Sequence, residues 1–499
     1  MKDDSTDILK RSAISPALDE SIRHLKTLFS SPENADLRLR ELQRGDIRLC
    51  AVYMDGLADE DRIGDFIIRP LQGRAMDVLL SGDSAAKAIA DHIIEVSGAE
   101  TASILDALIA PILAGKTCLL IDGCAEALIL DTLKPPHRGI DKPEAESVIC
   151  GSHEAYTEHL RTNLSMLRRY VQSENLICES MKVGMEIPTG IAIAYLKGVA
   201  NEKCISEVKR RILRIQAKSV LGIGALQQLI EDHPFAVMPQ MLQTERPDRT
   251  AAGLQSGQIA ILMDNSPYAL ILPITIFHLL HAPDDSFLRW QYGTLMRIVR
   301  MFGLLLSLLL PALYLSVTLY HTHLIPMPLL TSIAETRANV PFPIAAEILF
   351  MEASFHLLNE AGMRMPRQIG SALGIVGALI LGQAAVSASI ISPILIIIVA
   401  LTGLGTYATP DYSFGMGIII YRTLLILLSA FMGLYGVMLG MFFIALQLCS
   451  LESFGVKYLS PVAPHHRHNP DIIARLPIWM QRRAMFFASQ TRIWGGDSN

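Results

Sequence analysis

The longest apolar stretch of the chain runs from Gln368 to Pro410 and contains no Asp, Glu, Lys or Arg. As a helix it would extend about 64 Å, roughly twice the 30 Å of a bilayer's hydrocarbon core. A break is expected at Ser392-Pro393, because Pro is favoured at the first position of a helix. The pattern therefore predicts two membrane crossings here and an integral membrane protein.

Two further apolar runs flank this stretch, Met301 to Tyr320 and Thr423 to Leu451. The first follows an aromatic and basic approach segment typical of an inner membrane interface. With both chain ends on the cytoplasmic side, the number of crossings must be even. Four crossings are predicted, or six if Pro341 to Leu358 also crosses and the last run folds as a hairpin near Gly433 to Gly436.

Residues before 290 have an ordinary soluble composition and alternate short apolar strands with helical stretches. Strands are expected after Asp46, from Thr117 to Leu130, from Thr189 to Leu196 and from Gln258 to Leu272. The turns at Asp122-Gly123 and Asp264-Asn265 suit the positive φ of hairpins. The predicted fold class is an α/β cytoplasmic region of two modules followed by an all-α polytopic membrane domain. The expected domains are a polar helical lead-in (1–45), module 1 (46–180), module 2 (181–290), a helical transmembrane domain (291–460) and a basic cytoplasmic tail (461–499).

Composition excludes several classes of function. The net charge of −5 gives no basic stripe of the kind that nucleic acid requires. The seven cysteines are odd in number and never form a C-x-x-C pair, so we expect reduced thiols rather than a metal site or disulfides. No nucleophile with a base and no phosphate-binding loop is present. We therefore predict neither enzymatic activity nor a cofactor.

Polar residues in the soluble half are interpreted as structural. Asp residues after apolar strands commonly bond to the backbone of a turn. The segment Thr244 to Arg249 pairs two acids with two bases, and we expect an ion-pair lattice or an interface there. Its members are Glu245, Arg246, Asp248 and Arg249.

The chain resembles the A subunits of the GerA-type spore germination receptors and their stage V sporulation relatives. The resemblance extends from about Asp46 to Pro464. The stretches that carry it include AVYMDGLAD, APILAGKTCLLIDG, LQTERPDR, MDNSPYALILP, RWQYGTLMRIVR, NVPFPIAAEILFMEASFHLLNEAG and SFGVKYLSPVAP. Cys150 to His153 and Asn265 depart from the family pattern, and Asn265 replaces a Gly that a left-handed turn would favour.

The resemblance implies a multi-pass subunit of a receptor in the inner membrane of bacterial spores. It further implies a homo-oligomer, a ring of five, that conducts monovalent cations when a transporter-like B subunit senses a nutrient, with a lipoprotein C subunit as a further partner. The alternative is a non-conducting receptor or scaffold subunit that assembles partners and relays a signal. Neither the nutrient nor the choice between receptor subunit and sporulation paralogue follows from the sequence.

Acids inside an apolar helix are costly and usually face a bundle interior or water. Glu352, His356 and Asn359 share one helical face, which in a symmetric oligomer would form rings suited to cations. These three, with Glu347 on another face, are the candidate pore-lining residues. The alternative is that Glu352 pairs with Arg364 or Arg367, or that the segment lies at the membrane interface. Gln383 is expected to form an interhelical hydrogen bond.

Overall fold

The computed structural model describes residues 9–44, 47–72, 99–133, 150–364 and 382–463, with scattered residues between 86 and 96, 143 and 148, and 474 and 479. The chain divides into two compact units. The first holds Met1–Pro234 and Met241–Ile274, and the second holds Phe235–Gln240 and Thr275–Ala484. Residues 235–240 therefore pack with the second unit, although the residues on either side belong to the first.

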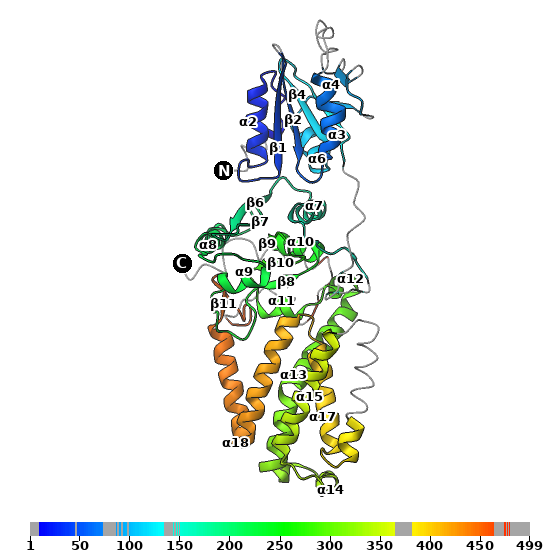
Figure 1. Ribbon diagram of the computed structural model, residues 1–499, viewed down its shortest axis with the longest axis vertical. Helices are drawn as coiled ribbons and strands as arrows, with labels where there is room; N and C mark the ends of the chain where they lie inside the picture. Colours follow the sequence, from blue (N-terminus) through cyan, green and yellow to red (C-terminus); the bar gives the residue numbers. More distant parts are fainter. Residues whose placement is uncertain are drawn as a thin grey trace. The chain divides into compact units, whose positions relative to one another are not determined.

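The first module of the soluble unit is a five-stranded antiparallel sheet in the order β1-β2-β4-β5-β3. Helices α2 and α6 cover one face, and α3, η1 and α4 pack on the other, each over its own apolar core (Figure 1). Its elements are α2 (Leu18–Leu28), β1 (Leu37–Arg44), β2 (Ile47–Met54), α3 (Glu60–Ile63), η1 (Gly64–Ile68), α4 (Arg69–Gln72), β3 (Glu100–Ala102), α6 (Asp106–Leu113), β4 (Thr117–Ile121) and β5 (Ala127–Leu130).

The second module repeats this topology, with strands in the order β6-β7-β9-β10-β8. Helices α7 and α10 share a core with one face of the sheet. Its elements are α7 (Leu160–Tyr170), β6 (Leu176–Val183), β7 (Thr189–Leu196), α8 (Glu202–Leu213), α9 (Ile223–Ile230), β8 (Leu242–Thr244), α10 (Pro247–Gln255), β9 (Ile259–Met263) and β10 (Ala269–Leu272).

The two modules correspond position by position. β2 and β7, β4 and β9, and β5 and β10 each begin 142 residues apart, and so do α2 and α7. The predicted hairpins are confirmed as the antiparallel pairs β4–β5 and β9–β10, with Gly123 and Asn265 at positive φ. The lead-in predicted for residues 1–45 contributes helix α2 and strand β1 to the first module. The boundary predicted at 180 falls within β6.

The turn carboxylates of these hairpins have matching structural roles. Asp122 Oδ1 accepts the backbone N–H of Leu18 at 3.0 Å, and Asp264 Oδ1 accepts that of Leu160 at 3.2 Å. Helices α2 and α7 begin after Ala17 and His159, whose side chains make no cap hydrogen bond. Because the first-turn N–H groups of a helix lack intrahelical partners, each Asp satisfies one from across the fold. These contacts support the structural interpretation of both residues.

A buried ion pair joins the two modules. Arg168 of α7 donates to Asp36 at 3.1 Å and to Asn34 Oδ1 at 2.8 Å, and the guanidinium is fully buried. Nearby, the N–H of Ala35 donates to the carbonyl of Cys178 in β6. The segment before β1 is therefore bound to the second module by both side-chain and backbone hydrogen bonds.

The second unit is helical. It contains α11 (Ile276–Leu280), α12 (Asp284–Phe287), α13 (Trp290–Tyr320), η3 (Thr322–Leu324), α14 (Met327–Arg337), α15 (Ile344–Arg364), α17 (Pro393–Tyr407), α18 (Tyr412–Ser450), and the short strands β11 (Glu452–Ser453) and β12 (Val456–Lys457). Within the described residues, α13 and α18 are long and apolar enough to cross a membrane. Helix α17 begins at the predicted break, Ser392-Pro393.

Helix α18 is a helical hairpin (Figure 1). Gly433 has φ 59° and ψ −139°, which interrupts the helix at the predicted position. A Cβ on Gly440 would lie 2.5 Å from Leu425 Cδ2, and Tyr421 donates to Gln447 at 2.9 Å, so the halves pack side by side. The halves, residues 412–432 and 434–450, are about 31 and 26 Å long, each close to one bilayer crossing.

Small residues set the spacing of the helices. A Cβ on Gly405 of α17 would lie 2.2 Å from the carbonyl oxygen of Gly303 in α13. A Cβ on Gly403 would lie 2.7 Å from the Phe355 ring of α15. Close approach through glycine is the usual way in which membrane helices gain packing energy, since lipid gives them no hydrophobic drive to associate.

Removal of the cap at Asp264 should destabilise the soluble half. We expect residues 1–285 to express as a folded soluble fragment and Asp264→Ala to lower its free energy of unfolding by about 1 kcal/mol, in denaturant titration. The exposed Glu33, replaced by Ala, should change it by less than about 0.5 kcal/mol. Equal effects of the two substitutions would contradict the capping role.

Substitution of Gly405 should disturb the packing of α13 against α17. Gly405→Ala forces a methyl group onto the Gly303 carbonyl, and we expect a lower thermal midpoint of the detergent-purified chain. Gly362→Ala in α15 is the matched control, because no atom lies within 4 Å of its built Cβ. The control should leave the midpoint unchanged or raise it, because Ala is the better helix former.

Candidate functional site in the membrane helices

A charged cluster lies inside the membrane helices. Arg422 of α18 donates through Nη2 to Glu352 Oε2 of α15 at 2.6 Å. The same nitrogen is 3.3 Å from Nε2 of His356, one turn further along α15. Arg422 is 1% exposed and Glu352 is 7% exposed. The carboxylate of Glu352 therefore has a cation within its own chain, from a helix 70 residues away.

Two hydroxyl groups complete the surroundings of Arg422. Its Nη1 donates to Ser307 of α13 at 3.2 Å and to Thr406 of α17 at 3.0 Å, and the two hydroxyls are 2.7 Å apart. One side chain of α18 thus contacts three other helices, α13, α15 and α17. Glu352 Oε1 and Arg422 Nε have no hydrogen-bond partner within the described residues. The cluster is therefore paired in charge but incompletely satisfied in hydrogen bonds.

A second buried pair holds the other end of α15. Arg337 of α14 lies 2.9 Å from Glu347, whose other oxygen accepts the N–H of Ser392 at 3.2 Å. Tyr314 OH and Ser392 Oγ are also buried and have no hydrogen-bond partner among the described residues. Glu347 and Glu352 therefore tie α15 to two different elements, α14 and α18.

The remaining predicted site residues are placed as follows. His356 keeps about a third of its side chain accessible, and Asn359 is half-buried. The opposite, exposed face of α15 is apolar and includes Phe350 and Leu357. Gln383 is exposed, and its side chain forms no hydrogen bond with the described residues. The side chain of Arg364 and all of Arg367 lie outside the described residues, and the sequence-based alternative for Glu352 did not include Arg422.

A third charged cluster marks the start of α13. Asp285 of α12 accepts from Arg300 at 3.0 Å and from Arg297 at 3.3 Å. Burial alone would raise the pKa of Asp285, but the hydrogen bonds and charges of the two arginines outweigh it and hold the pKa below its ordinary 3.8. Arg475 of the C-terminal tail also docks here, through hydrogen bonds to the carbonyls of Ser286 and Leu288 and to Thr294.

The polar segment Thr244 to Arg249 forms ion pairs and hydrogen bonds within the second module. Arg246 is fully buried, donates to Asp248 at 2.6 Å and reaches the carbonyl of Ser152 at 3.0 Å. Arg249 pairs with Glu146, which also accepts from Thr244. The backbone carbonyl of Glu245 accepts the N–H of Tyr156. These contacts fasten the loop before α7 to the start of α10, so the cluster has a clear structural role.

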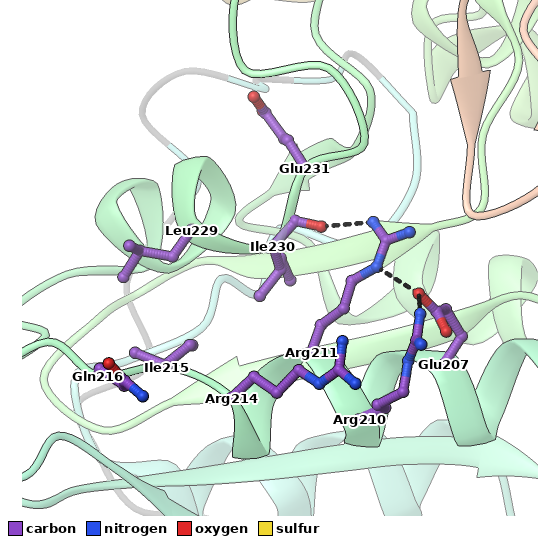
Figure 2. Close-up of a pocket in the computed structure, with 9 residues that line it drawn as sticks. All are labelled: Glu207, Arg210, Arg211, Arg214, Ile215, Gln216, Leu229, Ile230 and Glu231. Carbon is purple, nitrogen blue, oxygen red and sulfur yellow. Dashed lines mark hydrogen bonds and ion pairs between the residues drawn. The ribbon is translucent and has the colours of Figure 1, made fainter.

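An open groove of about 400 Å³ lies between the ends of α8 and α9 (Figure 2). Its central cation, Arg211, bonds to the carbonyl of Ile230 and to Glu207 and Asp232, and Arg210 also bonds to Glu207. The charges of Arg210 and Arg211 are therefore already neutralised by acids of the same module. Among the described residues no group of His, Cys, Asp or Glu is arranged to hold a metal ion.

The seven thiols are all free, and four of them are buried. Burial raises the pKa of Cys50, Cys118 and Cys204 to about 12, which leaves them protonated and unreactive at neutral pH. The four buried thiols, Cys50, Cys118, Cys178 and Cys204, therefore act as core side chains.

Comparison with known proteins identifies the family. Residues 23–486 match the family model described as Bacillus/Clostridium GerA spore germination protein. The chain is 38% identical to "Spore germination protein KA" of Bacillus subtilis (strain 168), over 94% of this chain and 86% of that protein. It is 36% identical to "Uncharacterized membrane protein YfkQ" of the same organism, over 94% and 91%.

Among solved structures, the chain is similar to the crystal structure of the N-terminal domain of the A subunit of the Bacillus megaterium spore germinant receptor GerK3. The identity is 27% and the TM-score 0.42, covering 52% of this chain and 96% of that one.

The chain belongs to the GerA spore germination protein family. It is a homologue of the A subunits of these germination receptors and carries membrane helices after its two soluble modules. Membership confirms the prediction that the protein is not an enzyme, because members of the family are receptor subunits.

Stability of the second unit should depend on Asp285. Because the pKa of this acid is lowered, its charged form contributes stability that is present above the ordinary value of 3.8 and is lost as the pH falls through the lowered pKa. We expect Asp285→Asn to lower the thermal midpoint at pH 7. The difference from the unchanged chain should persist down to about pH 4 and shrink only below it. A difference that disappears between pH 7 and 5 would contradict the pairing.

Proposed function

We propose that the chain is the channel-forming A subunit of a spore germination receptor, located in the inner membrane of the spore with both ends in the spore core. In this proposal it forms a homo-oligomeric ring, of five copies, that conducts monovalent cations. A transporter-like B subunit and a lipoprotein C subunit are its partners. The observation that supports conduction is the placement of charged side chains, Glu352, Arg422 and His356, deep among membrane helices, where their cost favours a functional role.

The contacts at the ends of the membrane helices support an even number of crossings. The N–H of Ile276, before α13, donates to the carbonyl of Tyr458, after α18. The tip of the α18 hairpin is at the far end of α13, where Tyr320 donates to the carbonyl of Ala430 at 2.6 Å. The chain therefore enters and leaves the helical layer on the same side, in accord with cytoplasmic N- and C-termini.

Helix directions favour six crossings rather than four. Helices α15 and α17 both start near the outer end of α13, where Glu347 meets Ser392 and Tyr314 lies nearby. Both helices then run past Ser307, in the middle of α13, toward the inner end of α13. With α13 and the two halves of α18 this gives five crossings. The sixth crossing predicted from the sequence, the first half of the Gln368 to Pro410 run, lies mostly outside the described residues.

Helix α15 is the proposed pore element. Its His356 and Asn359 are partly accessible and share the face that carries Glu352, so they are the residues best placed to meet a water-filled path. Glu347 and Glu352 supply negative charge to this helix, and both are neutralised by arginines in the present arrangement. A conducting arrangement requires this face to turn toward the centre of the ring.

Reconstitution tests the channel. The purified oligomer in liposomes should raise the flux of monovalent cations above that of protein-free vesicles, with cations preferred over anions. Asn359→Asp should strengthen that preference because it adds one acid per subunit to the proposed path. Ser332→Asp, which adds the same charge on an exposed position of α14, should not.

An assembled oligomer that conducts no ions would instead favour the non-conducting scaffold. The soluble half gives that alternative its own support, because its charged clusters are satisfied internally and suit contact rather than chemistry. In that case the membrane helices would anchor and assemble, and a signal would pass through the modules alone.

A further inference from the structure

Helix α15 is held by buried apolar residues, Ile344, Ile348 and Met351, and by its charged residues. It packs on α17 through Phe355, whose ring fills the space over Gly403 and lies beside Tyr407. Among the described residues, its polar connection to α18 is the contact of Glu352 and His356 with Arg422. Its outward face, with Phe350 and Leu357, is exposed. One cation therefore links the proposed pore element to the α18 hairpin.

The first half of α18 is itself firmly bound. Ser429 donates to the carbonyl of Ala312 at 2.7 Å, and Arg422 donates to Ser307 of the same partner helix, α13. At its inner end, the space beside Gly417 is filled by Met238 and the carbonyl of Val237, within the segment 235–240. Tyr458 and Ser453 hold that segment through the carbonyls of Pro239 and Gln240.

These contacts form a continuous chain from segment 235–240 to α15. Gly417 and Arg422 are five positions apart on one helix, about 7.5 Å along its axis. A displacement of the segment would therefore move Arg422 with the helix, and Arg422 carries the contact with Glu352. Coupling through such a chain requires an element that has two arrangements. Helix α15 is such an element if Glu352 can exchange its contact with Arg422 for water.

We propose that Arg422 is the positioning residue that holds α15 in the resting arrangement, with Glu352 as its charge partner, and that loss of this pair frees α15 to turn toward the water-filled path. The inference rests on the proposed channel function for its conduction test. A buried acid without a cation is strongly unfavourable, so Glu352 left alone would either protonate or draw its helix toward water. When Glu352 is removed, Arg422 keeps its charge and is left without its charge partner, which is also unfavourable.

The proposal and a simple pore-lining role of Glu352 predict opposite results for one variant. If Glu352 only lines the path, Glu352→Gln should lower cation conductance. If Arg422 holds α15, both Glu352→Gln and Arg422→Gln should raise the resting cation leak of reconstituted oligomers at least about tenfold, because each leaves one buried charge unpaired.

The double variant Glu352→Gln with Arg422→Gln contains no unpaired charge, and two Gln side chains can hydrogen-bond to each other. The double variant should return the leak to within about twofold of the leak of the unchanged protein. This recovery is the coupling between the two residues that a double-mutant cycle measures. The matched control is Arg337→Gln, which breaks the other buried pair of α15. It should lower thermal stability without raising the leak, since the contact with α18 is intact.

A cysteine-labelling measurement tests the inference without conduction. With Cys124→Ser, Cys150→Ser and Cys449→Ser, the variant Asn359→Cys reports whether the face of α15 that carries Glu352 meets water, because Asn359 is half-buried on that face. Alkylation should be at least about tenfold faster in each single variant and slow again in the double variant. Oligomers that show this pattern but conduct nothing would refute the channel and retain the positioning role. Equal labelling in all variants, or a double variant as fast as the singles, would overturn the inference.

Discussion

A carboxylate within the thickness of a bilayer must find a cation or water, and the membrane half of this protein is arranged around that constraint. Glu347 and Glu352, on one helix, each meet an arginine from a different element. The cost of burying such pairs often exceeds their mutual attraction, so they are weak sources of stability. They do impose specificity, because any arrangement of α15 that separates either pair leaves a bare charge in an apolar setting.

The glycine contacts make this arrangement possible. Arg422 can reach Ser307, Thr406 and Glu352 together because α13 and α17 approach closely at Gly303 and Gly405. The reversal at Gly433 brings the two halves of α18 into contact and lets the chain leave on the side where it entered. The charge pairing of Arg422 therefore depends on the glycines that let the helices approach.

Much of the fold could be predicted, because its signals are local. The Asp-Gly and Asp-Asn turns and the helix start at Pro393 each depend on neighbours within a few residues. The helix-capping role of Asp122 and Asp264 could not be predicted in this way, because each carboxylate binds the start of a helix that begins 104 residues earlier. The duplicated topology was also not predicted, although β5 and β10 have the same sequence, Ala-Leu-Ile-Leu.

The partner of Glu352 was missed for the same reason, although one signal was present. Arg422 is the only Lys or Arg between Arg367 and Lys457, and it lies in a run that is otherwise uncharged from Tyr412 to Leu451. A single cation in one apolar segment requires an acid from another, just as Glu352 requires a cation. Proximity along the chain pointed instead to Arg364 and Arg367. In a membrane domain, matching isolated charges across segments is the sounder guide, because lipid offers neither charge an alternative partner.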